Sequence, residues 1–202
     1  MPVNKKIRLA TPEDSAVLLD IYAPFVRDTA VSFEYDVPTV AEFSTRIVNI
    51  TPKYPWLVCE IDGRIVGYAY ASRFSERKAY DWSVDASLYI HPDYHRKKIG
   101  VALYSCLLDL LKLQGFYSVY AVITGVNQRS LDFHQSLGFK PAGFYHNVGY
   151  KLNQWQDVQW LVLTITDYIK PPQKLKSIVE IKQDPAFDLA LLKALGMIQD
   201  IK

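Results

Sequence analysis

The chain has 202 residues, of which 50% are hydrophobic, 22% are charged and 13% are aromatic, with a formal net charge of +2. This composition is typical of a globular protein and too weakly basic to predict a nucleic-acid partner, which requires a strongly basic face. We find no signal-peptide pattern at the N-terminus and no segment near the ~20 apolar residues of a membrane-spanning helix. The cysteines, Cys59 and Cys106, lie in apolar runs without ligand spacing. We therefore expect a cytoplasmic protein with no membrane or nucleic-acid partner.

The first 80 residues predict a strand, two helices and a hairpin. A strand over residues 6–11 precedes a helix whose first residue is Pro12, a position that suits proline. A capping box starts a second helix at Thr39, and this helix is expected to end near Ile50. Two apolar runs within residues 55–72 flank an Asp-Gly pair, which is a strong hairpin signal.

The next 85 residues complete the pattern of a mixed sheet. Residues 84–91 and 117–124 predict strands, and residues 99–115 predict a helix with an apolar face and a glycine at its C-terminal cap. A short helix is expected within 127–139, and residues 143–165 predict two strands joined by a loop. This order describes an α/β (α+β) fold, a mixed sheet with helices on its faces.

The last part of the chain has a different character. We predict a main domain over residues 1–169, and an extension over 170–202 that consists of a Pro-Lys linker and an amphipathic helix from residue 184. The apolar residues of this helix would dock on the main domain, on a second subunit or on another protein. The sequence leaves these three alternatives open.

A basic turn joins the strand at 84–91 to the following helix. A strand that feeds a helix presents unpaired backbone N–H groups and the positive end of the helix dipole, and His95 to Lys98 add cationic groups there. The turn is therefore either a phosphate cradle or a solvated basic connection. His91 and His95 lack a carboxylate or cysteine to complete a ligand set, so we expect no metal site.

Resemblance to a known family favours the cradle. "HRKKIGVAL", with "YIHP" before it and "NQRSLDFHQSLGF" after it, resembles the acetyl-CoA signature of the GNAT superfamily of N-acetyltransferases. Stretches such as "TAVSFE", "YPWLVCEIDGRIVGYAYAS" and "RKAYDWSVDASLYIHP", in order over residues 6–166, resemble its phosphinothricin and methionine sulfoximine acetyltransferase branch. The resemblance implies a GNAT fold with a mostly antiparallel sheet, two splayed parallel strands, helices on both faces, acetyl-CoA as cosubstrate and a homodimer.

The resemblance also implies a cofactor site. Backbone groups of the strand would hold the pantetheine arm, the turn would hold the pyrophosphate, and the asparagine and serine of the short helix would assist. The implied positions are Leu88, Tyr89, Ile90, His95, Arg96, Lys97, Lys98, Ile99, Gly100, Val101, Asn127 and Ser130. His95 and Lys98 depart from the family pattern, which has Gln or Arg and Gly at these positions. Lys98 would either add a phosphate contact or crowd the backbone.

Two residues match catalytic positions of the family. Asp85 stands where the phosphinothricin branch has a glutamate, and it would accept the amine proton through a water. His134 stands where many members have a tyrosine, and it would protonate the departing thiolate. The plainer alternatives, a strand-edge aspartate and a helix-surface histidine, remain open.

Four residues match positions that line the acceptor pocket of this branch. Phe33 would form an apolar wall, and Arg77 and Tyr80 would contact a carboxylate of the acceptor. Ser75 replaces a lysine of the phosphinothricin enzymes, which weakens the case for a doubly anionic acceptor.

The resemblance thus implies an N-acetyltransferase that acts on the α-amine of a small amino acid or analogue, and we expect direct attack in a ternary complex. A second interpretation is an acetyltransferase of protein or polyamine amines. A third is a catalytically impaired CoA-binding or interaction module, which Lys98 and Asp85 keep open.

Overall fold

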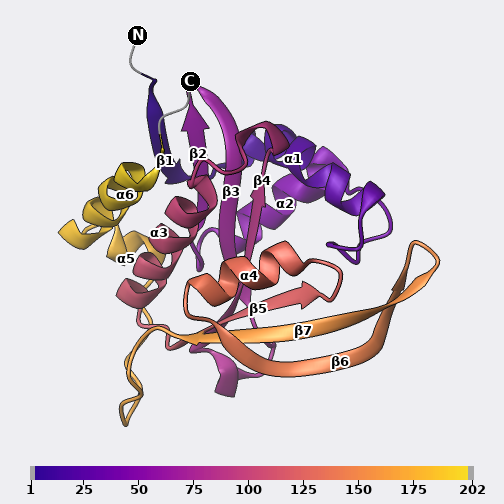
Figure 1. The fold of residues 1–202 in the computed structure, drawn as a ribbon. Coiled ribbons are helices and arrows are strands. Elements are labelled where there is room, and N and C mark those ends of the chain that lie inside the picture. Colours follow the sequence, from indigo (N-terminus) through magenta and orange to yellow (C-terminus); the bar gives the residue numbers. More distant parts are fainter. Residues whose placement is uncertain (1–2, 200–202) are drawn as a thin grey trace.

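A seven-stranded sheet forms the centre of the computed structural model, which describes residues 3–199 (Figure 1). The strands are β1 (Lys5–Leu9), β2 (Trp56–Ile61), β3 (Arg64–Arg73), β4 (Ser83–Ile90), β5 (Ser118–Thr124), β6 (Lys140–Lys151) and β7 (Gln154–Thr164). Their order across the sheet is β1-β2-β3-β4-β5-β7-β6, and only β4 and β5 pair in parallel. The predicted mixed, mostly antiparallel sheet is confirmed.

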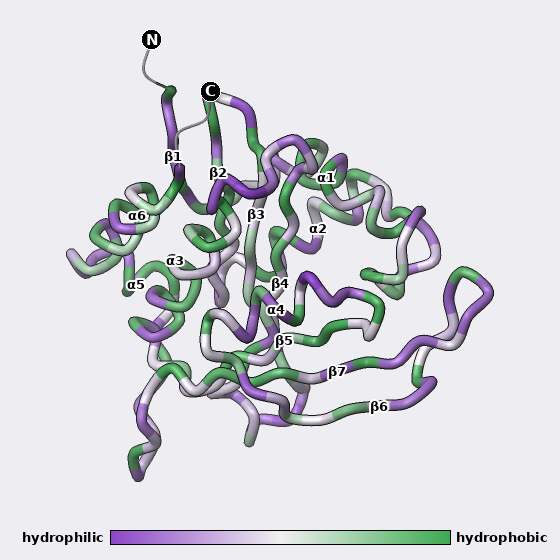
Figure 2. Tube along the Cα trace, viewed as in Figure 1, coloured by the Kyte–Doolittle hydropathy of each residue, from purple (hydrophilic) through white to green (hydrophobic). Residues whose placement is uncertain are grey.

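Helices cover both faces of the sheet (Figure 1). The helices are α1 (Ser15–Asp28), α2 (Val40–Ile50), α3 (Ile99–Gln114), α4 (Gln128–Ser136), α5 (Ile178–Ile181) and α6 (Pro185–Met197). One buried cluster joins α1 and α2 to β2 and β3, and a second joins α3, α5 and α6 to the opposite face. Figure 2 shows α3 and β5 as predominantly hydrophobic, in keeping with their burial. No helix within residues 3–199 is both long and apolar enough to cross a membrane.

The two parallel strands part halfway along their length. Pairing between β4 and β5 runs from Ser83 opposite Ser118 to Asp85 opposite Tyr120. Beyond this point β4 continues to Ile90 and β5 to Thr124 without pairing to each other. A wedge-shaped gap therefore opens at Asp85, as the resemblance implied.

The predicted turns and caps mostly form. Asp62 and Gly63 connect β2 to β3 with positive φ angles of 48° and 80°, which suits an Asp-Gly hairpin turn. The helix expected from Pro12 differs, because a 3₁₀ turn over Pro12–Asp14 precedes α1. Arg8 grips the Asp14 carboxylate at 2.7 Å, and this carboxylate also accepts the Thr11 N–H at 2.8 Å. These contacts fix the first turn separately from the helix.

The C-terminal extension packs on the rest of the chain. Ile181 and Ala194 are almost fully buried in the same cluster as α3, and the Lys193 ammonium lies 2.9 Å from the Asp109 carboxylate of α3. Of the three docking alternatives, the structure shows the main domain. The helix predicted from residue 184 to the end of the chain ends at Met197, because Ile198 is extended, and the predicted residues 200–202 lie outside the described residues. The domain boundary at residue 169 stays a prediction.

Candidate active site

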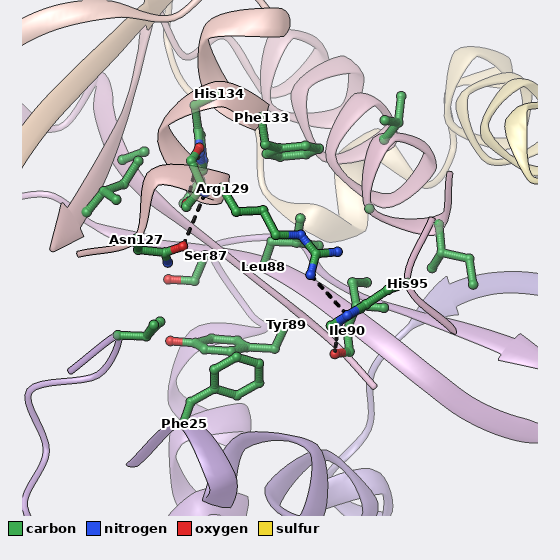
Figure 3. Close-up of a pocket in the computed structure, with 18 of the residues that line it drawn as sticks. Phe25, Ser87, Leu88, Tyr89, Ile90, His95, Asn127, Arg129, Phe133 and His134 are labelled. Carbon is green, nitrogen blue, oxygen red and sulfur yellow. Dashed lines mark hydrogen bonds between the residues drawn. The ribbon is translucent and has the colours of Figure 1, made fainter. Parts of the chain in front are cut away.

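A cavity of about 600 Å³ lies in the gap between β4 and β5. Its walls come from both parted strands, the turn before α3, the start of α4 and the end of α1 (Figure 3). A volume of this size is typical of sites that hold small ligands or cofactors. Eleven of the twelve cofactor positions implied by the resemblance line the cavity, and Lys97 does not.

The parted edge of β4 offers backbone groups to a ligand. The His91 N–H donates to the Val66 carbonyl of β3 at 2.9 Å, so His91 faces β3. Because neighbouring residues of a strand direct their backbone groups to opposite sides, the N–H groups of Leu88 and Ile90 face the gap. An extended polar arm lying in the gap would replace the missing partner strand.

The turn before α3 forms a concave group of N–H donors. The first helical hydrogen bond runs from the Ala102 N–H to the Lys98 carbonyl at 2.9 Å, so the three preceding N–H groups have no partner within the helix. Arg96 and Lys98 have φ angles of 62° and 58°, in the left-handed region. Alternating left- and right-handed residues direct successive N–H groups inward to an anion. Lys98 thus adopts the backbone conformation for which glycine is the usual choice.

His95 fastens this turn to the neighbouring elements rather than pointing freely into the cavity. Its Nε2 lies 3.1 Å from the Ile90 carbonyl, and its Nδ1 lies 3.1 Å from the guanidinium of Arg129 on α4 (Figure 3). The carbonyl must accept and the guanidinium must donate, which defines a neutral imidazole with its proton on Nε2. Burial also lowers the pKa of His95, which favours this neutral form.

The start of α4 forms the opposite wall. The Asn127 side-chain oxygen accepts the Ser130 N–H at 3.2 Å and caps the helix, which leaves its amide N–H₂ group available to a ligand (Figure 3). His134 is only 5% exposed, so it is not a helix-surface residue. Its Nδ1 lies 2.8 Å from the Ser130 carbonyl and its Nε2 lies 3.0 Å from the Tyr104 hydroxyl. Burial lowers the pKa of the imidazole, which is therefore neutral near pH 7.

Asp85 lies at the apex of the gap, at the last paired position of β4. It is opposite Ser72 of β3 and Tyr120 of β5, one residue before Ala86, where the cavity wall begins. Within the described chain its Oδ1 atom is buried and has no hydrogen-bond partner. Burial raises the pKa of this carboxyl to about 7. A carboxylate with a pKa near the working pH, beside a cavity, has the properties of a general base.

The predicted acceptor residues lie outside the cavity. Ser75, Arg77 and Tyr80 are in the loop between β3 and β4, and Tyr80 is 45% exposed. This loop approaches the Asp85 end of the gap through aromatic contacts, because Phe74 lies 5.6 Å from the Tyr80 ring and 4.4 Å from the Tyr120 ring. The three residues are therefore placed at one end of the gap rather than in its walls.

Phe33 lies at a different place, where the β6–β7 hairpin meets the loop after α1. Its ring packs on Gly149 so closely that a Cβ atom there would overlap it. The buried Lys151 ammonium donates to the Val26 carbonyl at 2.7 Å and to the Ser32 carbonyl at 2.6 Å. The hairpin thus holds the Phe33 loop in position.

Three of the lining residues that were not predicted from the sequence make informative contacts or come from a distant part of the chain. Phe25 packs on Tyr89 with ring centroids 5.2 Å apart, Arg129 reaches His95, and Gln199 comes from the C-terminal extension. Arg129 follows Asn127 by two residues at the start of a helix, so its place beside the cap was a usable signal. Within residues 3–199 no cluster of three or more His, Cys, Asp or Glu side chains could hold a metal ion.

Comparisons with known proteins agree with this geometry. A family model described as an acetyltransferase (GNAT) domain matches residues 7–160. A phosphinothricin N-acetyltransferase from Streptomyces viridochromogenes is 37% identical, covering 76% of this chain and 84% of its own length. An L-methionine sulfoximine/L-methionine sulfone acetyltransferase from Salmonella typhimurium is 30% identical, covering 82% of this chain and 97% of its own.

A solved structure shows the same fold with acetyl-CoA. The phosphinothricin acetyltransferase from Sinorhizobium meliloti, described as a complex with acetyl-CoA, has a TM-score of 0.77 and 31% identity to this chain. The match covers 85% of this chain and 96% of that structure.

Proposed function

Because the chain belongs to the GNAT family of acetyltransferases, we propose that it acetylates the α-amine of a small amino acid or analogue with acetyl-CoA. One observation carries the proposal: a single gap leads from a turn of unpaired N–H groups to a carboxylate at its apex. Acetyl transfer from a thioester to an amine requires both an anion site for the cofactor phosphates and a base beside the reacting carbonyl. The relatives named for phosphinothricin and methionine sulfoximine support the acceptor class.

The residues of the cavity fit acetyl-CoA along its length. In our proposal the pyrophosphate accepts the N–H groups of Ile99, Gly100 and Val101 at the positive end of α3. The pantetheine arm lies along β4 and accepts a hydrogen bond from the side-chain N–H₂ group of Asn127. The N–H of Leu88 or Ile90 polarises the thioester oxygen and stabilises the negative charge that forms there.

Asp85 is the proposed general base. The acceptor ammonium must lose a proton before it can attack, and a carboxyl with a pKa of about 7 accepts one readily near neutral pH. The neutral amine then attacks the thioester directly. Cys59 and Cys106 are buried thiols whose pKa burial raises to about 12, so neither favours a covalent acyl-enzyme.

His134 is the proposed proton donor to the departing thiolate. Its ring lines the cavity and is neutral before reaction. Because the Nδ1–H donates to the Ser130 carbonyl, Nε2 is the nitrogen that would take up the proton lost by the attacking amine and release it to the departing thiolate. His134→Gln tests this role: a fall in kcat with an unchanged acetyl-CoA affinity supports it, whereas an unchanged kcat leaves His134 only as the link between α4 and Tyr104.

Phe33, Ser75, Arg77 and Tyr80 are the proposed contacts of the acceptor. An exposed Arg77 guanidinium at the Asp85 end can grip one carboxylate, and Ser75 supplies no second cation. An acceptor with one carboxylate and an uncharged side chain, such as methionine sulfone, therefore fits better than phosphinothricin, whose phosphinate adds a second negative charge. A polyamine, which is a cation, does not suit Arg77.

The test is release of the CoA thiol from acetyl-CoA with a panel of acceptors. The panel contains phosphinothricin, methionine sulfoximine, methionine sulfone, the free amino acids, spermidine and a short peptide. Turnover restricted to amino acids and analogues supports the proposal. Turnover only on peptide or spermidine moves the function to protein or polyamine amines, and binding without any turnover supports a CoA-binding module.

We also propose a cytoplasmic homodimer. The β6–β7 hairpin exposes four aromatic side chains by 47–64%, namely Phe144, Tyr145, Tyr150 and Trp155. An exposed aromatic group of this kind is typical of an interface between subunits. Light scattering coupled to gel filtration gives the mass in solution, and a monomer at micromolar concentration contradicts this part of the proposal.

A further inference from the structure

The C-terminal extension ends at the cofactor turn. Helix α6 runs beside α3 (Figure 1), and Ile198 after it is only 5% exposed. The Gln199 N–H donates to the Lys97 carbonyl at 3.1 Å, and the Lys5 ammonium of β1 donates to the Ile198 carbonyl at 3.1 Å. Gln199 is also part of the cavity wall. The end of the extension is thus fixed between β1 and the turn.

The hydrogen bond from Gln199 acts on the most constrained part of the turn. Lys97 lies between Arg96 and Lys98, and both of these have left-handed φ angles that are unfavourable for residues with a Cβ atom. Since the peptide unit is planar, fixing the Lys97 carbonyl also fixes the direction of the Lys98 N–H. His95, bonded to the Ile90 carbonyl, restrains the other end of the turn. The turn is therefore held from both sides before any ligand binds.

We infer that the C-terminal extension, through its residues 178–199, is a working part of the cofactor site, with Gln199 as a positioning residue for the phosphate-binding turn. The inference rests on the proposed use of acetyl-CoA. The extension lies outside the family match at residues 7–160, so this restraint is an addition to the matched domain. Its ligand is the pyrophosphate of CoA, since the Lys97–Lys98 peptide directly precedes the N–H groups of Ile99, Gly100 and Val101 that we propose bind this anion. A donor held in place loses less freedom on binding and binds more tightly.

The experiment separates the backbone N–H of Gln199 from its side chain. Gln199→Pro removes the N–H, and the φ and ψ of Ile198, −72° and 120°, already suit a residue before proline. Gln199→Ala keeps the N–H and is the matched control. We expect Gln199→Pro to weaken acetyl-CoA binding about threefold to tenfold, the usual worth of one hydrogen bond. Gln199→Ala removes only the share of the side chain in the cavity wall, so it should weaken binding less than Gln199→Pro does.

Acetyl-pantetheine, which has the thioester but no pyrophosphate, distinguishes positioning from general damage. With this donor, kcat/KM of Gln199→Pro should equal that of the wild-type protein. Equal losses with both donors, or no loss with acetyl-CoA, overturn the inference. Wild-type protein that does not bind acetyl-CoA overturns the proposed function itself, whereas binding without turnover leaves the positioning role testable by calorimetry.

A second measurement needs no variant. In ¹⁵N-labelled wild-type protein, CoA should shift the amide resonances of Lys98 and Gln199, because the phosphates bind the turn that these residues hold. Pantetheine should leave both resonances in place. A Gln199 resonance that does not respond to CoA contradicts the inference even if Gln199→Pro fails to fold.

Discussion

Replacing Asp85 by Asn tests the base and the cause of its raised pKa together. Burial raises the pKa of Asp85 from 3.8 to about 7, and no described residue bonds its Oδ1 atom. A base with this pKa is about nine-tenths ionised at pH 8 and one-tenth ionised at pH 6. The ratio of kcat/KM between wild type and Asp85→Asn should therefore rise about tenfold from pH 6 to pH 8. Taking the ratio cancels the titration of the acceptor amine, which both proteins share.

Stability gives an independent measure of the same pKa. Between about pH 4 and pH 7 folded Asp85 holds a proton that the unfolded chain has lost, so the wild type loses stability as the pH rises. Asn does not titrate. The free energy of unfolding of Asp85→Asn relative to wild type should thus increase by about 3 kcal/mol from pH 5 to pH 8. Urea titrations at each pH measure this difference in the free energy of unfolding. If the difference does not change with pH and the kcat/KM ratio also stays constant, the reasoning is refuted.

Three further variants test the parts around the cavity. Lys151→Met should lower the free energy of unfolding by about 2–3 kcal/mol in urea titrations, because two buried carbonyls lose their donor; a loss below 1 kcal/mol contradicts this. Gly149→Ala should displace the Phe33 ring and raise KM for the acceptor while KM for acetyl-CoA stays the same; equal effects on both remove Phe33 from the acceptor site. Lys98→Gly should raise the free energy of unfolding by about 1 kcal/mol, because glycine adopts the left-handed φ of this position without strain. The same variant should bind CoA more weakly in calorimetry at low salt. Unchanged binding would show that the Lys98 ammonium does not contact phosphate.

Local signals were sufficient for most of the fold. The Asp-Gly turn, the Thr39 capping box and the glycine at the end of α3 each act over a few residues, and each forms as predicted. Helix α5 was not predicted, because four residues give no periodicity to detect. The split at Pro12 was missed for a different reason. It depends on the hydrogen bond between the Arg8 side chain and the Asp14 carboxylate, which the pattern of helix-start residues does not reveal.

The cavity was only partly predictable. The turn and the start of α4 are continuous in sequence, so residues such as Asn127 could be assigned from the resemblance and now line the cavity. Gln199 could not, because it reaches the turn from about 100 residues away through the packing of α6. The burial of His134 likewise depends on Tyr104 of α3, which no pattern within α4 reveals.

The two ends of the gap depend on the amino-acid sequence in different ways, because one end consists of backbone groups and the other of side chains. This difference explains why the cofactor is easier to infer than the acceptor. The cofactor end is built from backbone: parted strands and N–H groups of a turn, which tolerate His95 and Lys98 as long as the conformation is kept. The proposed acceptor contacts are side chains on two separate loops, one with Phe33 and the other with Arg77. One side-chain change there alters charge or shape directly, so family membership constrains the acceptor far less than it constrains the use of acetyl-CoA.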